Sequence, residues 1–172
     1  MTLTLTVTRG LPGSGKTTWA LGWAARTGAA RVNRDSLRDM LHGPAYRRTA
    51  EQEDAVTAAS RGAVAGLLGD GLSVVVDDTN LGPAVMQYWA DLADQQNAAL
   101  AVVDFTAVPL SACVARDRSR PVREPDGGCV GAQVGEAVIV RMHAEYLAGG
   151  RSDLWSAAEA TRRGHPVLAF TT

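Results

Sequence analysis

One segment restricts the fold of this chain more than any other: Gly10-Leu11-Pro12-Gly13-Ser14-Gly15-Lys16-Thr17. It satisfies the Walker A pattern of glycine, four residues, glycine, lysine and threonine. Residues 3–8 before it alternate apolar side chains with threonines, as strands do, and residues 16–26 after it have a helical pattern. Because the backbone N–H groups of such a strand-to-helix turn surround anions, the segment predicts a phosphate-binding loop in an α/β protein.

The residue types in this loop indicate the ligand as well as the fold. Lys16 is the only lysine of the chain, whose other strongly basic residues are arginines. A compact ammonium suits the β- and γ-phosphates of a nucleotide, and the hydroxyl of Thr17 can hold Mg²⁺. The sequence therefore predicts ATP and Mg²⁺ as cofactors, with nucleotide-binding residues Gly10, Pro12, Gly13, Ser14, Gly15, Lys16, Thr17 and Thr18. The alternative is a glycine-rich turn that binds no ligand.

Short apolar segments alternate with helical patterns along the chain, which is typical of an α/β protein with a parallel sheet. We expect strands at residues 3–8, 30–33, 72–77, 100–105 and 167–170. We expect helices at residues 16–26, 35–41, 51–68, 83–95, 109–118, 134–147 and 152–161. The nearly continuous apolar run at 72–77 predicts a central strand beside the first. A length of 172 residues fits one domain, residues 1–172.

The composition argues against several classes of protein. With a net charge of −1, the chain lacks a general positive field, so any nucleic-acid site must be a local patch. No stretch approaches the roughly 20 apolar residues of a membrane span, and residues 1–8 do not read as a signal peptide. Cys113 and Cys129 are too few for a disulfide framework and lack metal-ligand spacing. We expect a cytoplasmic protein with no membrane partner.

Polar residues after the second expected strand form a candidate site for a phosphoryl acceptor. Asp35 stands near the start of a short expected helix, and Arg38 lies one turn later on the same face. In the functional interpretation, Asp35 is a general base that takes the proton of an acceptor hydroxyl, and Arg38 binds an acceptor phosphate. In the alternative, Asp35 only caps the helix and Arg38 pairs with it.

Two carboxylates, Asp77 and Asp78, follow the apolar part of the third expected strand. An apolar strand that ends in aspartate resembles the element that supports Mg²⁺ through water in proteins with a phosphate-binding loop. We assign Asp78 to this role, together with Thr17, although the sequence does not firmly separate the two aspartates. Both residues could instead serve as helix caps or turn residues.

Arginines gather at the edge of a segment rich in glycine and proline. Four of them, including Arg116 and Arg120, lie between residues 116 and 123. They predict a lid at about residues 116–131, because arginines placed over a transferring phosphoryl group stabilise its developing charge. Arg116 and Arg120 are therefore expected to bind the nucleotide. The alternative is a solvated basic helix end that complements the helix dipole.

These segments together resemble the kinase half of bacteriophage-type polynucleotide 5′-kinase/3′-phosphatases. The resemblance covers about residues 3–147 and depends most on two pieces, Asn33-Arg34-Asp35 with Arg38 and Asp78-Thr79-Asn80-Leu81. It implies the three-layer P-loop kinase fold, with a five-stranded parallel sheet in the order 2-3-1-4-5, helices on both faces and an arginine-bearing lid. The chain has no Asp-x-Asp-x-Thr motif, so we expect no phosphatase activity.

The resemblance also implies roles for individual residues. It makes Asp35 the general base, lets Arg38 contact the acceptor's phosphate, and lets Arg120 contact the donor phosphates; with Lys16, these are the expected catalytic residues. Asp78 and Thr79 are expected to join Asp35 and Arg38 in binding the acceptor.

The expected function is transfer of the γ-phosphoryl group of ATP to 5′-hydroxyl ends of DNA or RNA, a step of nucleic acid repair. One alternative is a kinase of the same fold that acts on a hydroxymethylated DNA base or a small-molecule hydroxyl. Another is an ATP-binding switch protein that phosphorylates no acceptor.

Overall fold

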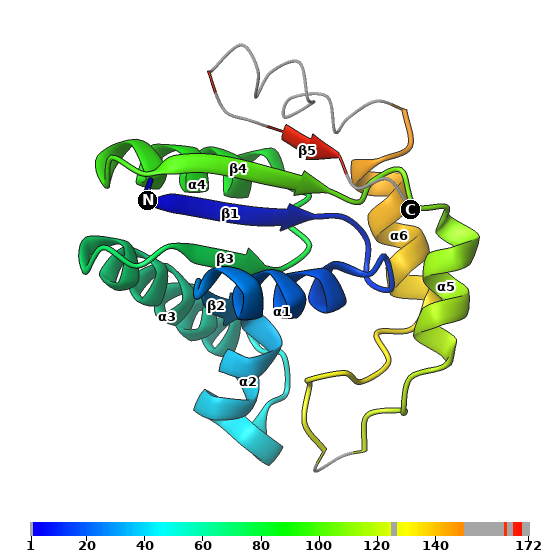
Figure 1. The fold of residues 1–172 in the computed structure, drawn as a ribbon. Coiled ribbons are helices and arrows are strands. Elements are labelled where there is room, and N and C mark those ends of the chain that lie inside the picture. The colour runs from blue at the N-terminus through cyan, green and yellow to red at the C-terminus, as the bar shows by residue number, and fades with distance from the viewer. Residues whose placement is uncertain (1, 125–126, 150–163, 165–166, 170–172) are drawn as a thin grey trace.

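The computed structural model describes residues 2–124, 127–149, 164 and 167–169. A parallel sheet runs through it, with helices on both faces (Figure 1). Its strands lie in the order β2 (Ala30–Asn33), β3 (Val74–Asp77), β1 (Thr4–Arg9), β4 (Ala99–Asp104) and β5 (Val167–Ala169). The first four form the body of the sheet, and β5 is a three-residue strand at the edge beside β4. The expected fold class and strand order are confirmed.

The register of the strands brings their polar ends to one edge of the sheet. Asn33 at the end of β2 pairs with Asp77 at the end of β3, and Arg9 of β1 pairs with Asp104 of β4. All four residues of β3 are buried, as expected of a central strand. Since the apolar part of such a strand has no room for charge, side chains that carry chemistry gather along this carboxyl edge.

The helices begin and end within two residues of their expected bounds. They are α1 (Lys16–Thr27), α2 (Arg34–His42), the short 3₁₀ helix η1 (Gly43–Ala45), which was not expected, α3 (Ala50–Gly69), α4 (Pro83–Gln95), α5 (Leu110–Arg118) and α6 (Glu136–Tyr146). The helix expected at 152–161 lies outside the described residues. Among the residues that the structure describes, no helix has both the length and the apolar character needed to cross a bilayer.

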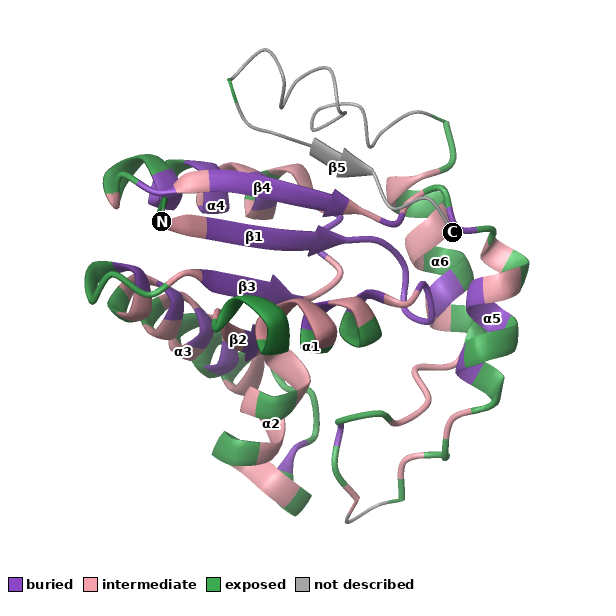
Figure 2. Ribbon diagram, viewed as in Figure 1, coloured by how far each residue is buried: buried purple, intermediate pink, exposed green. Residues whose placement is uncertain are grey.

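Two apolar clusters hold these layers together. In the larger one, Val64 of α3 and Met86 and Trp89 of α4 pack with strand residues such as Leu5, while α1 covers the other face of the sheet (Figure 1). The smaller cluster surrounds Phe105, just after β4, and packs α5 and α6 against the carboxyl edge. Figure 2 shows the central strands buried and the outer surfaces of the helices exposed. The packing therefore fixes the phosphate-binding loop between both clusters.

The expected lid differs from the observed segment in its bounds. Arg116 belongs to the last turn of α5, and the irregular segment runs from residue 119 to residue 135 instead of 116–131. Asp117 holds its far end, because the buried carboxylate accepts hydrogen bonds from the N–H groups of Val134 at 3.1 Å and Gly135 at 2.9 Å. These bonds satisfy amide donors at the start of α6 and fix where that helix begins.

The middle of this segment lies against α2. The N–H groups of Cys129 and Val130 donate to the two carboxylate oxygens of Asp39, at 2.6 and 3.1 Å. A Cβ atom on Gly128 would lie 2.8 Å from the same carboxylate, so a side chain there would displace the carboxylate of Asp39. The segment therefore bridges α5 and α2 across the carboxyl edge of the sheet (Figure 1).

Candidate active site

The phosphate-binding loop depends on glycine at two positions. Gly13 has a φ of 80°, and a Cβ atom there would lie 2.2 Å from the carbonyl oxygen of Cys113 in α5. Gly15 has a φ of 105° and is the N-cap of α1. A larger residue at either place would distort the loop, whose amides and helix N-terminus adjoin a cavity.

Lys16 is buried at the start of α1, next to that cavity. Its Nζ atom donates hydrogen bonds to the carbonyl oxygen of Leu11 at 2.7 Å and to the hydroxyl of Ser14 at 3.4 Å. Burial lowers the pKa of Lys16 from 10.5 to about 8, although the carboxylates of Asp78 and Asp77 act in the opposite direction. Because an adjacent anion would stabilise the charged form, the site favours a phosphate ligand.

Thr17 and Asp77 supply oxygen donors of the kind that Mg²⁺ prefers. The Oγ1 atom of Thr17 donates to Oδ1 of Asp77 at 3.2 Å. The other carboxylate oxygen of Asp77 accepts from Arg31 at 2.5 Å and from Asn33 at 3.3 Å. The residues present therefore fit the ion that Walker A proteins use with nucleotides.

Asp78, the aspartate assigned to Mg²⁺ from the sequence, lies in the cavity beside Arg34 and Thr79. Its Oδ2 atom lies 3.4 Å from Nε of Arg34, and its Oδ1 atom accepts a hydrogen bond from the N–H of Thr79. Burial raises the pKa of Asp78, while the nearby charge of Arg34 lowers it. Since Thr17 contacts Asp77 directly, Asp77 joins Thr17 as a candidate ligand of Mg²⁺, and support of the ion by Asp78 through water stays a prediction. Asp78 and Thr79 still line the cavity.

Asn80 binds the end of β1, directly before the phosphate-binding loop. Its amide nitrogen donates to the carbonyl oxygen of Thr8 at 2.8 Å, and its amide oxygen accepts from the indole of Trp89 at 3.0 Å. One residue earlier, the carbonyl oxygen of Thr79 accepts from the N–H of Gly10 at 2.9 Å. In the Asp78-Thr79-Asn80 segment, Asn80 thus has a structural role, whereas Asp78 and Thr79 line the cavity.

Asp35 and Arg38 form an ion pair on α2, with Nη1 of Arg38 2.7 Å from Oδ1 of Asp35. Asp35 does not cap the helix, because the N-cap is Asn33, whose side chain accepts a hydrogen bond from the N–H of Ser36. The capping alternative is therefore wrong, whereas the pairing is observed. The side chain of Asp35 is 44% exposed and lines the cavity, so an acceptor can reach it.

Glu53 of α3 connects the basic residues of this region. Its carboxylate accepts hydrogen bonds from Nε and Nη2 of Arg38 at 2.8 and 2.7 Å, from Arg34 at 2.8 Å and from the hydroxyl of Tyr46. The bonds from Arg38, with those from Tyr46 and Arg34, lower the pKa of Glu53. Sequence reasoning missed Glu53, because no local pattern links it to an arginine fifteen residues away.

One cavity of about 360 Å³ brings the expected donor and acceptor residues together. The expected residues that line it are Pro12, Gly13, Gly15, Lys16, Thr17, Thr18, Asp35, Arg38, Asp78, Thr79 and Arg120. It is also lined by residues outside the expected set, among them Asn33, Tyr46, Arg48, Glu53 and Asp77. Three expected nucleotide-binding residues do not line it: Gly10, Ser14 and Arg116.

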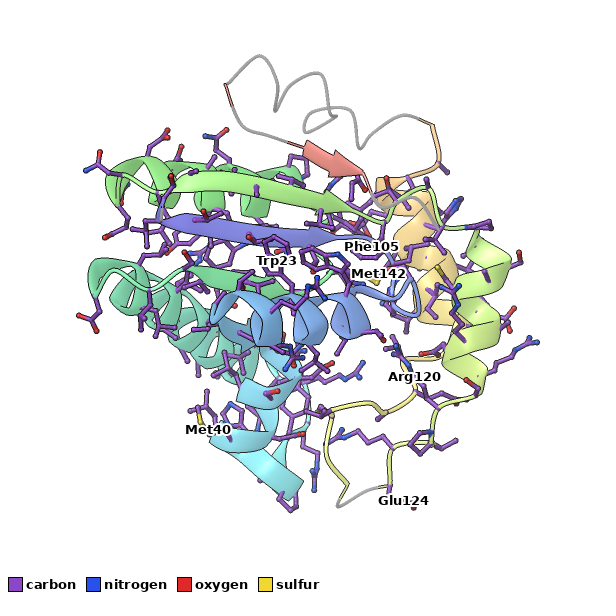
Figure 3. The ribbon with its side chains drawn as sticks, in the orientation of Figure 1. Trp23, Met40, Phe105, Arg120, Glu124 and Met142 are labelled. Carbon is purple, nitrogen blue, oxygen red and sulfur yellow. The ribbon has the colours of Figure 1, made fainter. Side chains whose placement is uncertain are left out.

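The two lid arginines lie in different places. Arg120 reaches the cavity from the segment after α5 and lies 3.5 Å from the carboxylate of Asp117 (Figure 3). Arg116 instead donates to the carbonyl oxygens of Gly13 and Ser14, at 3.4 and 3.3 Å. Arg116 therefore braces the phosphate-binding loop, and of these two arginines Arg120 is the one that lines the cavity.

The single lysine allows a direct test of the charge at the phosphate-binding loop. In protein labelled with ¹³C-lysine, the side-chain resonance of Lys16 should titrate near pH 8 without nucleotide, because burial disfavours its charged form. Added nucleotide should move the midpoint upward, since phosphate stabilises the ammonium. Unfolding in urea should return it to about 10.4. A midpoint of about 10.4 in the folded, nucleotide-free protein would contradict the burial of Lys16 beside the cavity.

Replacing Glu53 by glutamine should destabilise the protein above about pH 4.5 by about 1–2 kcal/mol, after allowance for solvent screening. Since the folded state holds the pKa of Glu53 low, its contribution is present above the unfolded pKa and is lost as pH falls through the folded pKa. Urea unfolding of both proteins at pH 7 and pH 3 measures this. Asp54→Asn, an exposed neighbour with the same charge change, should show no comparable loss.

Comparisons with known proteins agree with this geometry. The profile of the AAA_33 family, described as an AAA domain, matches residues 5–148. A structure of the Pnkp1/Rnl/Hen1 RNA repair complex is 26% identical, with a TM-score of 0.68 over 84% of this chain and 44% of that chain. The chain thus spans less than half the length of that relative. No curated protein matches the sequence significantly.

More distant structures share the fold alone. Kti12 of Chaetomium thermophilum, in complex with ADP-AlF3, is 19% identical, with a TM-score of 0.64 over 96% of this chain and 89% of that chain. A gluconokinase from Sinorhizobium meliloti 1021 is 16% identical, with a TM-score of 0.56 over 98% and 83%. A profile match over most of the sequence, a Walker A loop and a 2-3-1-4-5 parallel sheet lead to one conclusion. The chain belongs to the AAA_33 family and has the P-loop kinase fold.

Proposed function

We propose that this chain forms a single P-loop kinase domain, residues 1–172, and transfers the γ-phosphoryl group of ATP to the 5′-hydroxyl end of DNA or RNA. The observation that carries the proposal is the shared cavity, which holds the exposed carboxylate of Asp35 with Lys16 and Thr17. The similarity to Pnkp1 in an RNA repair complex supports a nucleic acid as acceptor.

On the donor side, Lys16 and the amides of the phosphate-binding loop hold the phosphates of ATP. Thr17 and Asp77 would hold Mg²⁺, which when bound offsets negative charge on the phosphates. Arg120 stabilises the charge that develops on the transferred group. Thr18 lines the same part of the cavity, and Arg116 keeps the loop in shape.

On the acceptor side, Asp35 orients the 5′-hydroxyl and accepts its proton as the oxygen attacks phosphorus. Arg38 binds the adjacent phosphate of the acceptor, and Asp78 and Thr79 line the wall beside it. Glu53 restricts the orientation of Arg38 through two hydrogen bonds. Among the described residues, Asp35 has one ion-pair partner, Arg38, and its exposed side is accessible to the acceptor.

The first test supplies labelled ATP·Mg²⁺ with two matched oligonucleotides, one ending in a 5′-hydroxyl and one in a 5′-phosphate. We expect label on the hydroxyl end alone, because only that end offers a nucleophile to Asp35. If neither oligonucleotide is labelled, the same assay is repeated with hydroxymethylated DNA and with a small alcohol. Label on either of these acceptors would favour the related kinase alternative. Tight ATP binding without any labelled acceptor would favour an ATP-binding switch protein.

Replacing Asp35 by asparagine should lower the turnover number for 5′-hydroxyl oligonucleotides by about 10²–10⁴-fold, because the amide cannot accept the proton. Nucleotide affinity, measured by calorimetry, should stay close to that of the unsubstituted protein. Ser36→Ala, at the exposed neighbour of Asp35 on α2, serves as the control and should retain turnover. Near-normal turnover of the asparagine variant would refute the general-base role.

A further inference from the structure

Arg48 lines the cavity but has no part in the reaction proposed above. It lies in the loop between η1 and α3, on an exposed stretch of chain, and contributes to the same cavity as Asp35 and Arg38. Its position on the acceptor side follows from these neighbours and from Tyr46, two residues earlier, which lines the cavity as well.

The charge of Arg48 has no ion-pair partner among the described residues, in contrast to the charges of Arg38 and Arg120, which line the same cavity. Arg34 and Arg38 are ion-paired with Glu53, and Arg120 lies 3.5 Å from the carboxylate of Asp117. Within the described part of the chain, Arg48 makes no hydrogen bond and no ion pair. A guanidinium that adjoins a cavity without an internal partner is available to an anionic ligand.

The backbone at Arg48 has a φ of 59°, a conformation that residues other than glycine rarely adopt. The loop cannot relax easily, because Gln52 clamps it: its side chain accepts from the N–H of Arg47 at 2.7 Å and donates to the carbonyl oxygen of Ala45 at 3.0 Å. Thr49 then caps α3 by accepting from the N–H of Gln52. Such imposed strain is characteristic of residues that bind ligands.

We infer that Arg48 binds a second backbone phosphate of the acceptor, beyond the one that Arg38 binds. The inference rests on the proposed function, since it assumes that a 5′-hydroxyl nucleic acid enters the cavity beside Asp35. A polynucleotide carries a phosphate on every successive residue, whereas a nucleoside 3′-monophosphate carries one and a neutral alcohol none. Arg48 therefore selects polymers over single nucleotides and acts as a specificity-determining residue.

The kinetic test compares two acceptors with the Arg48→Ala variant: a 5′-hydroxyl oligonucleotide of about six residues and a nucleoside 3′-monophosphate. Loss of one charge-assisted contact should raise KM for the oligonucleotide about tenfold and leave kcat unchanged. KM for the nucleoside monophosphate should not change. Arg47→Ala, a neighbour with the same charge change that does not line the cavity, should leave both values close to normal. Equal effects on both acceptors, or in both variants, would overturn the inference.

The variant Arg48→Gly distinguishes a role of Arg48 in binding the acceptor from a purely structural role. Arg48→Gly removes the guanidinium and relieves the strain of a positive φ, so its melting temperature should equal or exceed that of the unsubstituted protein. Its KM for the oligonucleotide should nevertheless rise as it does in Arg48→Ala. A lower melting temperature with unchanged KM would show that Arg48 has only a structural role.

Binding without turnover distinguishes failure of this inference from failure of the proposed function. The affinity for a fluorescent 5′-hydroxyl oligonucleotide falls as salt increases, and loss of one phosphate contact should reduce the slope of log K against log salt by about 0.7. A reduced slope in Arg48→Ala, with no phosphorylation by the unsubstituted protein, would refute the 5′-kinase function and retain the phosphate contact. Normal phosphorylation with an unchanged slope would refute the contact alone.

Discussion

Burial of the central strands on both faces is the constraint on which this structure depends. Residues Val74, Val75 and Val76 of β3 are almost completely enclosed, so Asp77 stands at the first position where a carboxylate finds polar partners. Those partners are Thr17 of α1 and Arg31 and Asn33 of β2, so they come from two other parts of the chain. The parallel register brings the ends of β2 and β3 together, so polar and charged side chains of the described strands gather at the carboxyl edge.

The residues that line the cavity at that edge are held in place in two different ways. The donor half is rigid because glycines, Asn80 and Arg116 fix the phosphate-binding loop through backbone contacts. The acceptor half is built from long charged side chains, and Glu53 holds Arg34 and Arg38 in defined positions. Pairing these charges within the protein lowers the cost of partial burial, and an anionic acceptor then has to compete with Glu53 for Arg38.

Much of this architecture is readable in the sequence, because short-range signals specify it. The Walker A pattern and the periodicities predicted the described strands and α-helices within two residues of their observed bounds, the valine run placed the third strand beside the first, and the family resemblance implied the strand order. The acceptor site was only partly predictable. Asp35 and Arg38 are neighbours on one helix turn, whereas Glu53 joins them from another helix and the backbone conformation of Arg48 arises from the clamp by Gln52. Such long-range pairings leave no periodic trace.

Two hydrogen bonds between Asp39 and the segment after α5 come from main-chain donors of that segment. Because the N–H groups of Cys129 and Val130 would be present with almost any side chains, the hydrogen bonds do not depend on which residues occupy these positions. Position 128 matters more, since a side chain in place of Gly128 would displace the carboxylate of Asp39. Substitution of Cys129 or Val130 can therefore change the side chains of this segment while Asp39 on α2 keeps its two contacts with the backbone. In evolutionary terms, the side chains of the segment and its path along α2 are separable traits.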